Sequence, residues 1–440
     1  MTKGEHALDR SARLIAGDIF QNSISNDDVI AGLLGTTARI FADEVNLDTP
    51  NGQTALVTLF TQLSMMGISV DLSIPRVKVI PPQPPLGNGD LETVLREYAD
   101  DLIPGLRSPG HDEYIDIVYV MGDTKEAGNE SIRVWGTEST ASTAPAQQHE
   151  GIRWHGDWAL AAIAAGATGA GEGLRAAVHR LTDLTGETPN REFDYDIGRP
   201  SFVDLKALGT PEQCSTVGAV DMISGGAITN AALYTLLRVP SLTGQIRVIE
   251  PDIVDMTNLN RYPLSRRSDI GLRKIDVLSW WSSDSLRITG LPVKFKLPLS
   301  GELSPMAPTV LVGADQIPVR WDAQRLEPSS LCIGATSHFF ATVSSHVPGK
   351  ACAGCSHARD ERGNDPIPTI SFVSLWAGLL QAIELLGHAG GFRWESRFVH
   401  CYPLGLAHPK GIVSGRQGPN HRCPLHCRAL QQHQQRGESE

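Results

Sequence analysis

The chain has 440 residues, of which 41% are hydrophobic and 20% charged, a composition typical of soluble globular proteins and long enough for more than one domain. Its net charge of −11 argues against nucleic acid or another polyanion as a partner. No basic–apolar leader opens the sequence and no charge-free apolar run of membrane-spanning length occurs, so we expect a cytoplasmic protein without a membrane partner.

The first part of the chain predicts a helix followed by a strand–helix–strand unit. Residues 5–21 favour a short helix, and strands are expected at Ala38–Val45 and Ile68–Ile74 around a helix at Gln53–Met66. The turn Leu47–Gly52 lacks the glycine cluster that lets a backbone approach a pyrophosphate. The unit therefore has the pattern of a nucleotide-binding fold without its phosphate loop.

The rest of this part continues the sheet. Strands are expected at Tyr114–Val120 and Ile132–Trp135, and the Ala-rich stretch Trp158–Leu181 predicts a packed helix pair. Thr185–Pro200, with its glycines and prolines, is the expected linker. Residues 1–194 carry 14 Lys and Arg against 28 Asp and Glu, so a bound nucleotide is expected in the second part.

The second part restarts the pattern. An apolar run at Ser215–Ile223 leads into Gly225-Gly226 and a helix at Ile228–Arg238. Such a turn can offer backbone N–H groups to a phosphate at a helix N-terminus, although Gly-Gly pairs also serve as plain turns. The later elements that we expect are strands at Val310–Val312 and Leu331–Ile333 and a helix at Ser371–Gly387.

Polar residues gather after the strand at Ile246–Ile249. Its end carries Glu250 and Asp252, and Asn258, Arg261 and Lys274 follow. Strand-end carboxylates hold ribose hydroxyls in nucleotide-binding sheets, and an arginine and a lysine in one crevice neutralise phosphates. The alternative is a salt-bridged strand and loop without a ligand.

This stretch resembles the ThiF/MoeB/ubiquitin-activating superfamily, whose signature is an acidic strand end, Ser/Thr-Asn-Leu-Asn-Arg and Asp-Ile/Val-Gly-x-x-Lys. The resemblance implies an α/β fold with two Rossmann-like ThiF-type domains in one chain. Residues 1–195 would be a degenerate, inactive adenylation half and residues 196–440 the ATP-binding half. The two would form an internal pseudodimer, and association of whole chains is left open.

The resemblance also implies roles for single residues. Glu250 would hold the ribose with Asp252 as the second acid, while Asn258, Arg261 and Lys274 would line the phosphates beside the Gly225-Gly226 turn. Asp315, which follows the strand at Val310–Val312, would hold Mg²⁺, although an aspartate there could instead cap the next helix. Arg320 would be structural. Arg10 would be an arginine supplied in trans, the alternative being a solvated helix residue.

The sequence departs from the family at two places. The outer glycines of the family's phosphate loop become Ile223 and Ile228. Members that form a thioester usually carry a cysteine in the crossover Ser356–Thr369, which here has none. Cys401, beside His400, is a weak candidate for a reactive thiol, and Cys214 and Cys332 suit a buried core.

Four of the seven cysteines predict a structural zinc site. Cys352 and Cys355 form one close pair and Cys423 and Cys427 another, and four thiolates suit a closed tetrahedral Zn²⁺ site in a reducing compartment. His426, three residues after Cys423, could replace Cys427.

We therefore expect an ATP-dependent adenylyltransferase with ATP, Mg²⁺ and Zn²⁺. By resemblance its substrate would be the C-terminal carboxylate of a ubiquitin-like or sulfur-carrier protein ending in Gly. A conjugating-enzyme-like partner and a bacterial antiviral defence operon are the expected context. Three alternatives stay open: adenylation of a peptide or small carboxylate, an NAD-dependent oxidoreductase, and a catalytically weak scaffold that binds a ubiquitin-like partner.

Overall fold

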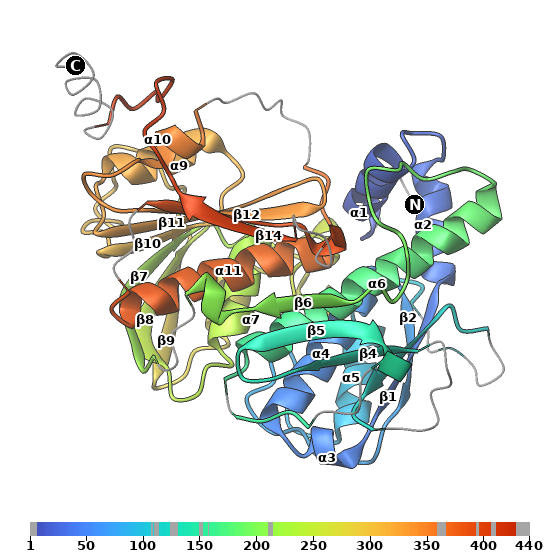
Figure 1. The fold of residues 1–440 in the computed structure, drawn as a ribbon. Helices are drawn as coiled ribbons and strands as arrows, with labels where there is room; N and C mark the ends of the chain where they lie inside the picture. Colours follow the sequence, from blue (N-terminus) through green and yellow to red (C-terminus); the bar gives the residue numbers. More distant parts are fainter. Residues whose placement is uncertain are drawn as a thin grey trace.

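Two β-sheets with helices packed between and around them make up the protein in the computed structural model (Figure 1). The structure describes residues 7–106, 109, 114–123, 131–148, 153–156, 158–209, 214–358, 367–392, 396–405 and 411–427. Most of the crossover at Ser356–Thr369, namely 359–366, and the first residues of the N-terminal stretch lie outside these ranges.

The first sheet is mixed, with parallel strands at one side and an antiparallel meander at the other. In spatial order its strands are β2 (Ser69–Ser73), β1 (Thr37–Ala42), β3 (Ile117–Met121), β4 (Ile132–Gly136), β5 (Thr140–Pro145) and β6 (Ser201–Asp204). The expected strands at 38–45, 68–74, 114–120 and 132–135 correspond to β1, β2, β3 and β4. β6 lies after the expected domain limit at residue 195 yet pairs with β5, so the first sheet extends beyond that limit.

Helices of the first half pack on this sheet. They are α1 (Asp9–Leu14), which continues into a π-helix (Ile15–Ile19), α2 (Asn26–Gly35), α3 (Glu44–Leu47), α4 (Pro50–Met65), α5 (Leu91–Asp100) and α6 (Leu160–Thr185). Thr49 caps α4 and Pro50 starts it, as residues at these positions commonly do.

The expected helix pair at Trp158–Leu181 is wrong: α6 is a single helix of 26 residues. Its glycines do not break it because they serve close packing instead. A Cβ atom on Gly166 would lie 2.7 Å from Cβ of Thr58, and one on Gly173 would lie 2.4 Å from a methyl group of Leu63. Both contacts are with α4, so the glycines let α6 approach that helix.

The second sheet repeats the plan on a larger scale. Five parallel strands are followed by an antiparallel meander. In spatial order the strands are β14 (Ile412–Arg416), β13 (Arg397–Cys401), β12 (Phe340–His346), β11 (Ser330–Ser337), β10 (Thr309–Val312), β7 (Thr216–Ile223), β8 (Thr243–Ile249) and β9 (Leu286–Leu291). The chain reverses its direction of winding at β7, which pairs with β8 on one side and β10 on the other.

The second half has its own helices. They are α7 (Ala227–Leu236), α8 (Lys274–Ser279), α9 (Ile317–Arg325), α10 (Ala353–Ser356) and α11 (Ser371–Ala389). Among the described helices, α11 is long and apolar enough to cross a bilayer, but 89% of the relevant window is buried inside the protein. Its one carboxylate, Glu384, is buried and accepts hydrogen bonds from Ser345 and Arg397, so α11 serves as a core helix.

The two halves share one hydrophobic core. A continuous cluster of buried residues runs from Ala7 to Leu404. Between the sheets, the hydroxyls of Thr58 in α4 and Tyr234 in α7 are 2.9 Å apart, and the Ser371 hydroxyl of α11 donates to the carbonyl of Gln62 in α4. Each half therefore buries apolar surface that it would otherwise expose, which couples their stabilities.

Candidate active site

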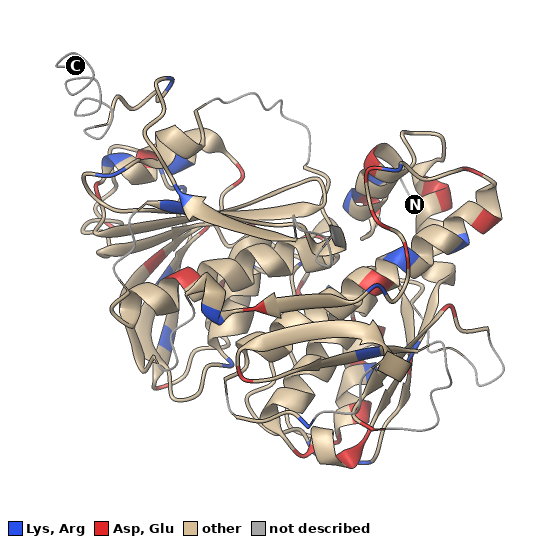
Figure 2. Cartoon of the chain, viewed as in Figure 1, with Lys and Arg blue, Asp and Glu red and all other residues tan. Residues whose placement is uncertain are grey.

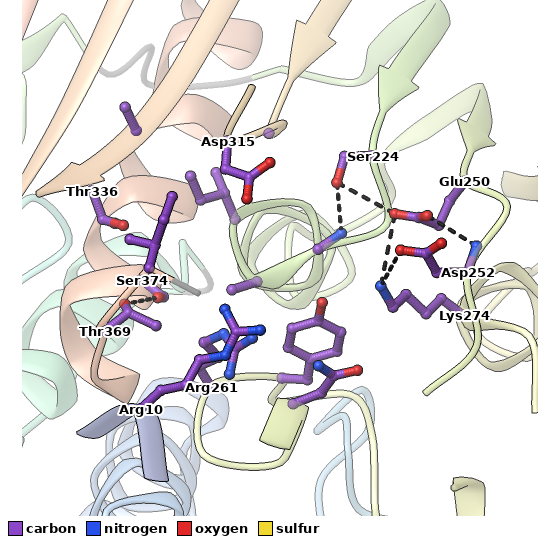
Figure 3. Close-up of a pocket in the computed structure, with 18 of the residues that line it drawn as sticks. Arg10, Ser224, Glu250, Asp252, Arg261, Lys274, Asp315, Thr336, Thr369 and Ser374 are labelled. Carbon is purple, nitrogen blue, oxygen red and sulfur yellow. Dashed lines mark hydrogen bonds and ion pairs between the residues drawn. The ribbon is translucent and has the colours of Figure 1, made fainter. Parts of the chain in front are cut away.

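A pocket of about 270 Å³ opens where the second sheet reverses its winding (Figure 3). It lies at the carboxyl ends of β7, β8 and β10 and at the N-terminus of α7, the usual ligand position in such sheets. The lining residues are Arg10, Ser224, Gly226, Ala227, Ile228, Glu250, Asp252, Asp255, Asn258, Arg261, Tyr262, Lys274, Gly313, Asp315, Arg320, Ala335, Thr336, Ile367, Thr369 and Ser374. The structure thus brings Arg10, Glu250, Arg261, Lys274 and Asp315 to one cavity.

Glu250 organises the floor of the pocket at the end of β8. Its carboxylate accepts hydrogen bonds from the backbone N–H of Gly225 at 2.8 Å and of Asp252 at 3.0 Å. A Cβ atom on Gly225 would lie 3.0 Å from Cγ of Glu250, so a larger residue would crowd this side chain. Gly225 was expected to face the phosphates; instead it lies behind the pocket wall and holds Glu250, while Gly226 lines the cavity.

Lys274 lies beside the two acids. Its ammonium group is 3.3 Å from the Asp252 carboxylate and 4.0 Å from that of Glu250. Burial works against its charge, but Tyr262 and the two carboxylates raise the pKa of Lys274 above its usual value. The group is therefore a permanent cation at neutral pH, held at the start of α8 and aimed at the pocket (Figure 3).

Arg10 and Arg261 meet on the opposite wall (Figure 3). Arg261 is buried and donates to the carbonyl of Thr257 and to Oδ1 of Asn260. Burial first, and the neighbouring charge of Arg10 as well, lower the pKa of Arg261 to about 10. An anion between the two guanidinium groups would offset both unfavourable effects.

Arg10 enters this cavity from α1 of the same chain. It was expected to reach an ATP site in trans, and here the first half of one polypeptide supplies it to the site of the second half. Arg10 is half-buried and lines the cavity, and its role toward a nucleotide stays a prediction.

Asn258 shapes the loop between these walls. Its side-chain oxygen accepts from the backbone N–H of Asp255 at 3.0 Å, and the Asp255 carboxylate accepts from Thr257. This reciprocal capping fixes the short turn that carries Arg261. Asn258 is buried and lines the cavity, so its amide contributes to the wall as well as to the turn.

The start of α7 offers backbone N–H groups to the cavity. Gly226 is its N-cap residue, and no side chain caps the helix. The N–H of Gly226 itself donates to the Ser224 hydroxyl at 3.1 Å, which leaves Ala227 and Ile228 of the first turn to face the pocket. A helix N-terminus whose N-cap residue makes no side-chain cap bond favours a phosphate.

Ile228 stands where the superfamily has a glycine, and the neighbouring strands accommodate it. A Cβ atom on Gly334 would lie 2.7 Å from a methyl carbon of Ile228, and one on Gly313 would lie 3.4 Å from its Cβ. The Ile228 side chain is buried and lies at one wall of the cavity against Gly313, which follows β10, and Gly334 of β11. Glycines 313 and 334 therefore provide the space that the departure from the family requires.

Asp315 follows β10 and faces the cavity from the side opposite the arginines (Figure 3). Its charge acts on Arg261, whose pKa it raises against the larger effect of burial. A single strand-end carboxylate beside a phosphate position fits Mg²⁺, which takes few protein ligands and the rest from phosphate and water. The N-cap residue of α9 is Gln316, which directly follows Asp315.

Arg320 forms hydrogen bonds within the protein, as a structural arginine would. It is buried in α9, and two of its nitrogens donate to the carbonyl of Ala314 at 3.0 and 3.1 Å while a third meets His357. These bonds fix the backbone next to Asp315.

Several wall residues were missed by sequence reasoning. Tyr262, Thr336, Thr369 and Ser374 line the cavity, and the Thr369 and Ser374 hydroxyls are 3.1 Å apart. Tyr262 directly follows Arg261, so its position in the signature could have singled it out. Thr336 and Thr369 carry no such signal, because they reach the site from segments distant in sequence.

The matching edge of the first sheet is closed by the chain itself. The Asp43 carboxylate after β1 accepts from the N–H of Asp123 after β3 at 2.8 Å. Over the start of α4, the Asn51 amide donates to the carbonyls of His155 and Gly156. The crevice that would receive a nucleotide is thus occupied by residues 153–156, in keeping with the predicted loss of a phosphate loop in this half.

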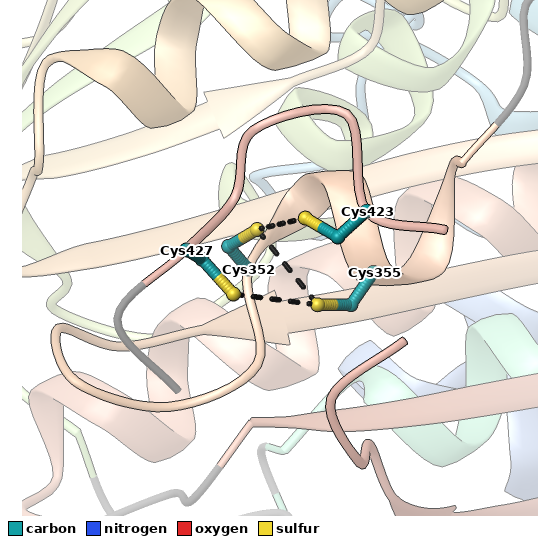
Figure 4. A group of neighbouring side chains, drawn as sticks. All are labelled: Cys352, Cys355, Cys423 and Cys427. Atoms are coloured by element: carbon teal, nitrogen blue, oxygen red, sulfur yellow. Dashed lines mark hydrogen bonds between the residues drawn. The ribbon is translucent and has the colours of Figure 1, made fainter. Parts of the chain in front are cut away.

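The four paired cysteines converge on one point (Figure 4). All four sulfur atoms lie within 4.8 Å of one another, and neighbouring sulfurs are 3.4 Å (Cys352–Cys423), 3.6 Å (Cys355–Cys427) and 3.9 Å (Cys352–Cys355) apart. Four thiolates at such separations fit a tetrahedral Zn²⁺ ion. Cys427, and not the alternative His426, completes the cluster.

The remaining thiols are buried. Cys214, Cys332 and Cys401 are at most 8% exposed, and burial raises the pKa of each. Cys401, the weak candidate for a reactive thiol, lies in β13 with no exposed surface. These three suit the core, as the sequence predicts for Cys214 and Cys332.

Comparisons with known proteins give distant similarities. No family model matches the chain. The chain is 24% identical to the uncharacterized protein y4jF of Sinorhizobium fredii (strain NBRC 101917 / NGR234) over 188 residues, which cover 41% of this chain and 36% of that protein. The chain therefore matches little more than a third of the length of this curated relative.

The solved structures to which the chain is similar include several of MccB from E. coli. MccB with AMPCPP and MccA is 19% identical over 48% of this chain and 66% of MccB, with a TM-score of 0.39. MccB with ATP is 18% identical over 47% and 65%, also at 0.39, and the microcin C7 biosynthetic enzyme MccB with N-formylated MccA is 18% identical over 47% and 67%, at 0.38.

Proposed function

We propose that this chain is an ATP-dependent adenylyltransferase that activates the carboxylate of a peptide. The observation that carries the proposal is the meeting of three cations, Arg10, Arg261 and Lys274, around the N-terminus of α7 in one cavity. Triphosphates carry several negative charges, and this arrangement supplies both cations and helix N–H groups at the switch point of the sheet.

The cavity also divides into two chemically different sides. Glu250 and Asp252 present carboxylates at the end of β8, suited to ribose hydroxyls, while the arginines lie on the opposite wall, suited to phosphates. Asp315 would hold Mg²⁺, which when bound neutralises charge on the phosphates. A nucleotide lying between these sides would place its α-phosphorus near the start of α7.

The reaction that this arrangement supports is an in-line displacement. An oxygen of the substrate carboxylate forms a bond to the α-phosphorus, and the bond from that phosphorus to the bridging oxygen of pyrophosphate breaks. An acyl adenylate and pyrophosphate result. The carboxylate is already ionised at neutral pH, so no general base is needed, and the residues act by positioning and by neutralising charge.

A peptide is the substrate class that we put first. MccB is recorded with ATP and with MccA, in accord with the peptide alternative, whereas the ubiquitin-like or sulfur-carrier protein implied by the signature stays a prediction. The cysteines outside the metal cluster are buried, so the described residues offer no accessible thiol for a thioester. The oxidoreductase alternative is disfavoured by the three cations, because a dinucleotide fold binds its pyrophosphate mainly through glycine-rich backbone.

The test is isotope exchange between pyrophosphate and ATP. Purified protein with Mg²⁺ is assayed with pools of short peptides that end in a free carboxylate, with the same pools amidated at the C-terminus, and with ubiquitin-like proteins ending in Gly-Gly. We expect exchange with free peptides and none with amidated ones, because the amide removes the attacking oxygen. Exchange with ubiquitin-like proteins alone would favour the ubiquitin-like substrate implied by the signature over a peptide. Failure to bind ATP in calorimetry would overturn the proposal.

A further inference from the structure

A second hollow, of about 630 Å³, lies apart from the candidate ATP site. Three segments form it: the π-helix after α1, the loop between α6 and β6, and the turn from β11 to β12 with the residues after β13. Its lining residues are Gly17, Asp18, Gln21, Asn190, Glu192, Phe193, Asp194, His338, Phe339, Phe340, Tyr402 and Leu404. We call it the aromatic groove.

The aromatic groove is built from ordered contacts. Phe193 meets Phe339 edge to face with ring centres 5.2 Å apart, and Phe340 meets Tyr402 at 5.5 Å. The backbone N–H of Asn190 donates to the carbonyl of Ile19, which fixes the loop against the π-helix. Aromatic rings in such a wall offer faces to apolar and cationic groups.

The charge of the aromatic groove is negative. Asp18, Glu192 and Asp194 line it, and its described lining residues include neither lysine nor arginine. Arg199 pairs with Asp194, and His338 lies 2.7 Å from Asp18. Glu192 is exposed in the same loop, where Figure 2 shows acidic residues beside the N-terminal helices. Carboxylates beside aromatic faces favour a cationic side chain.

Two elements connect the aromatic groove to the ATP site. Along the N-terminal helices, Arg10 lines the ATP pocket and Gly17 the groove, roughly 10 Å apart at the helical rise per residue. At the end of β11, Thr336 lines the pocket, and His338, in the turn that follows, lines the groove no more than about 7 Å away. A short extended peptide can span these distances in three or four residues.

We infer that the aromatic groove binds the peptide segment just before the reacting carboxylate and selects a basic side chain there. The inference rests on the proposed function, since the ATP site fixes where the carboxylate must lie. The carboxylate would enter beside Arg10, and a lysine or arginine a few residues earlier would lie over Phe340 and Tyr402 near Glu192. The groove thereby assigns a substrate class: short peptides with a basic residue close to a free C-terminus.

The experiment measures binding without ATP. Two pools of fluorescein-labelled heptapeptides, alike except for Lys or Arg against Asp or Glu at the third to fifth positions from the C-terminus, are titrated by anisotropy. We expect the basic pool to bind about tenfold more tightly, a difference in the range of a partly desolvated cation–aromatic contact with a nearby carboxylate.

Variants locate the effect in the aromatic groove. Glu192→Gln should reduce the preference for the basic pool by about threefold, the size of an exposed charge pair, and Glu187→Gln, in the same loop but outside the groove, is the matched control. Phe340→Ala should weaken the basic pool several-fold while ATP affinity stays unchanged. Equal binding of the two pools, or equal effects of Glu192→Gln and Glu187→Gln, would overturn the inference.

Exchange separates this result from failure of the proposed function. If a basic preference is seen but neither pool supports pyrophosphate exchange with ATP, the adenylation proposal fails and with it the assignment of the groove to a substrate. If both pools support exchange equally, adenylation stands and the selection of a basic residue is wrong.

Discussion

The side-chain amide of Asn260 donates a hydrogen bond to the hydroxyl of Ser11, 2.8 Å away and 249 residues earlier in the chain. The same amide donates to the carbonyl of Thr369, and its oxygen accepts from Arg261 at 2.6 Å. One buried side chain thus joins the helix that carries Arg10, the signature loop and the segment before α11. This bond fixes how the first half presents its arginine to the site of the second.

Replacing Asn260 by alanine should therefore disturb both stability and catalysis. The change leaves buried polar groups of Ser11 and Arg261 without this partner, and we expect the free energy of unfolding to fall by about 1–3 kcal/mol. Exchange should fall as well, because Arg10 and Arg261 lose their common anchor. Chemical denaturation and pyrophosphate exchange check the two effects. Ser11→Ala removes the hydrogen bonds of the Ser11 hydroxyl with Asn260 and with the carbonyl of Thr369 but leaves the bond between Asn260 and Arg261, so it should show the smaller change in both; the opposite order would contradict the anchoring role.

Arg10→Ala should lower exchange without unfolding the protein. The side chain lines the pocket from α1, and its removal takes one positive charge from the expected position of the phosphates. We expect a loss of at least tenfold in kcat/KM with an unchanged melting temperature. Arg13→Ala is the matched control, because Arg13 is in the same helix, pairs with Asp9 and lies outside the pocket. If the two variants behave alike, Arg10 has no role at the ATP site.

Asp315→Ala should abolish exchange. The substitution removes the carboxylate expected to hold Mg²⁺ at the edge of β10 without touching the core. Asp322→Ala, in the following helix and paired with Arg325, provides a control of equal charge change outside the pocket. Near-normal exchange at saturating Mg²⁺ in the Asp315 variant would remove this residue from the site.

Local patterns predicted most of the parallel strands and several of the residues that line the pocket. The signature at Glu250–Lys274 reads as one loop after one strand, so spacing alone brings Glu250, Arg261 and Lys274 together, and Asp315 follows a strand of the same sheet. Arg10 could be predicted as a site residue only from the resemblance, since nothing in residues 5–21 indicates that this helix contributes to a pocket in the second half. The structure also shows what holds these side chains in place, for example the hydrogen bond from the backbone N–H of Gly225 to the Glu250 carboxylate.

What the sequence did not predict depends on contacts between distant segments. The Ala-rich stretch Trp158–Leu181 suggested two helices, but it forms one, in which Gly166 and Gly173 pack against Thr58 and Leu63 of another helix. The closure of the first crevice by residues 153–156 and the bond between Ser11 and Asn260 have no periodic signal either. The spacing of hydrophobic residues and the residue types in turns predict contacts between residues close in the chain. Contacts between distant segments depend on how the whole chain folds, so they could not be predicted from these local patterns.

Cys352→Ser should release zinc and lower the melting temperature. The cluster ties α10 to residues 423–427, so loss of a thiolate weakens the link between these two segments. We expect about one equivalent of zinc per chain in the unaltered protein and a marked loss in the variant, measured by atomic emission after dialysis. Cys214→Ser changes a buried thiol outside the cluster and should retain the metal. Equal zinc content in the two variants would refute the ligand assignment.

The last prediction concerns His346, a histidine that burial keeps neutral. It lies at the end of β12, with Nδ1 3.1 Å from the carbonyl of Ala351 and Nε2 3.0 Å from the Ser344 hydroxyl. Burial lowers the pKa of His346 to about 4. The unfolded chain, with an ordinary imidazole pKa near 6.5, then binds the proton more readily than the folded one.

The folded state should therefore lose stability as the pH falls from about 6.5 toward 4, and it keeps the full contribution above that window. Between pH 7 and pH 5 the loss from this one group amounts to about 2 kcal/mol. His346→Gln keeps polar atoms at the site but cannot titrate, so its unfolding free energy should fall less over the same interval. Because protonation of carboxylates and of the zinc thiolates affects both proteins alike, it cancels in the difference between their denaturation curves. Parallel pH profiles for the two proteins would show that His346 is already free to bind a proton in the folded state.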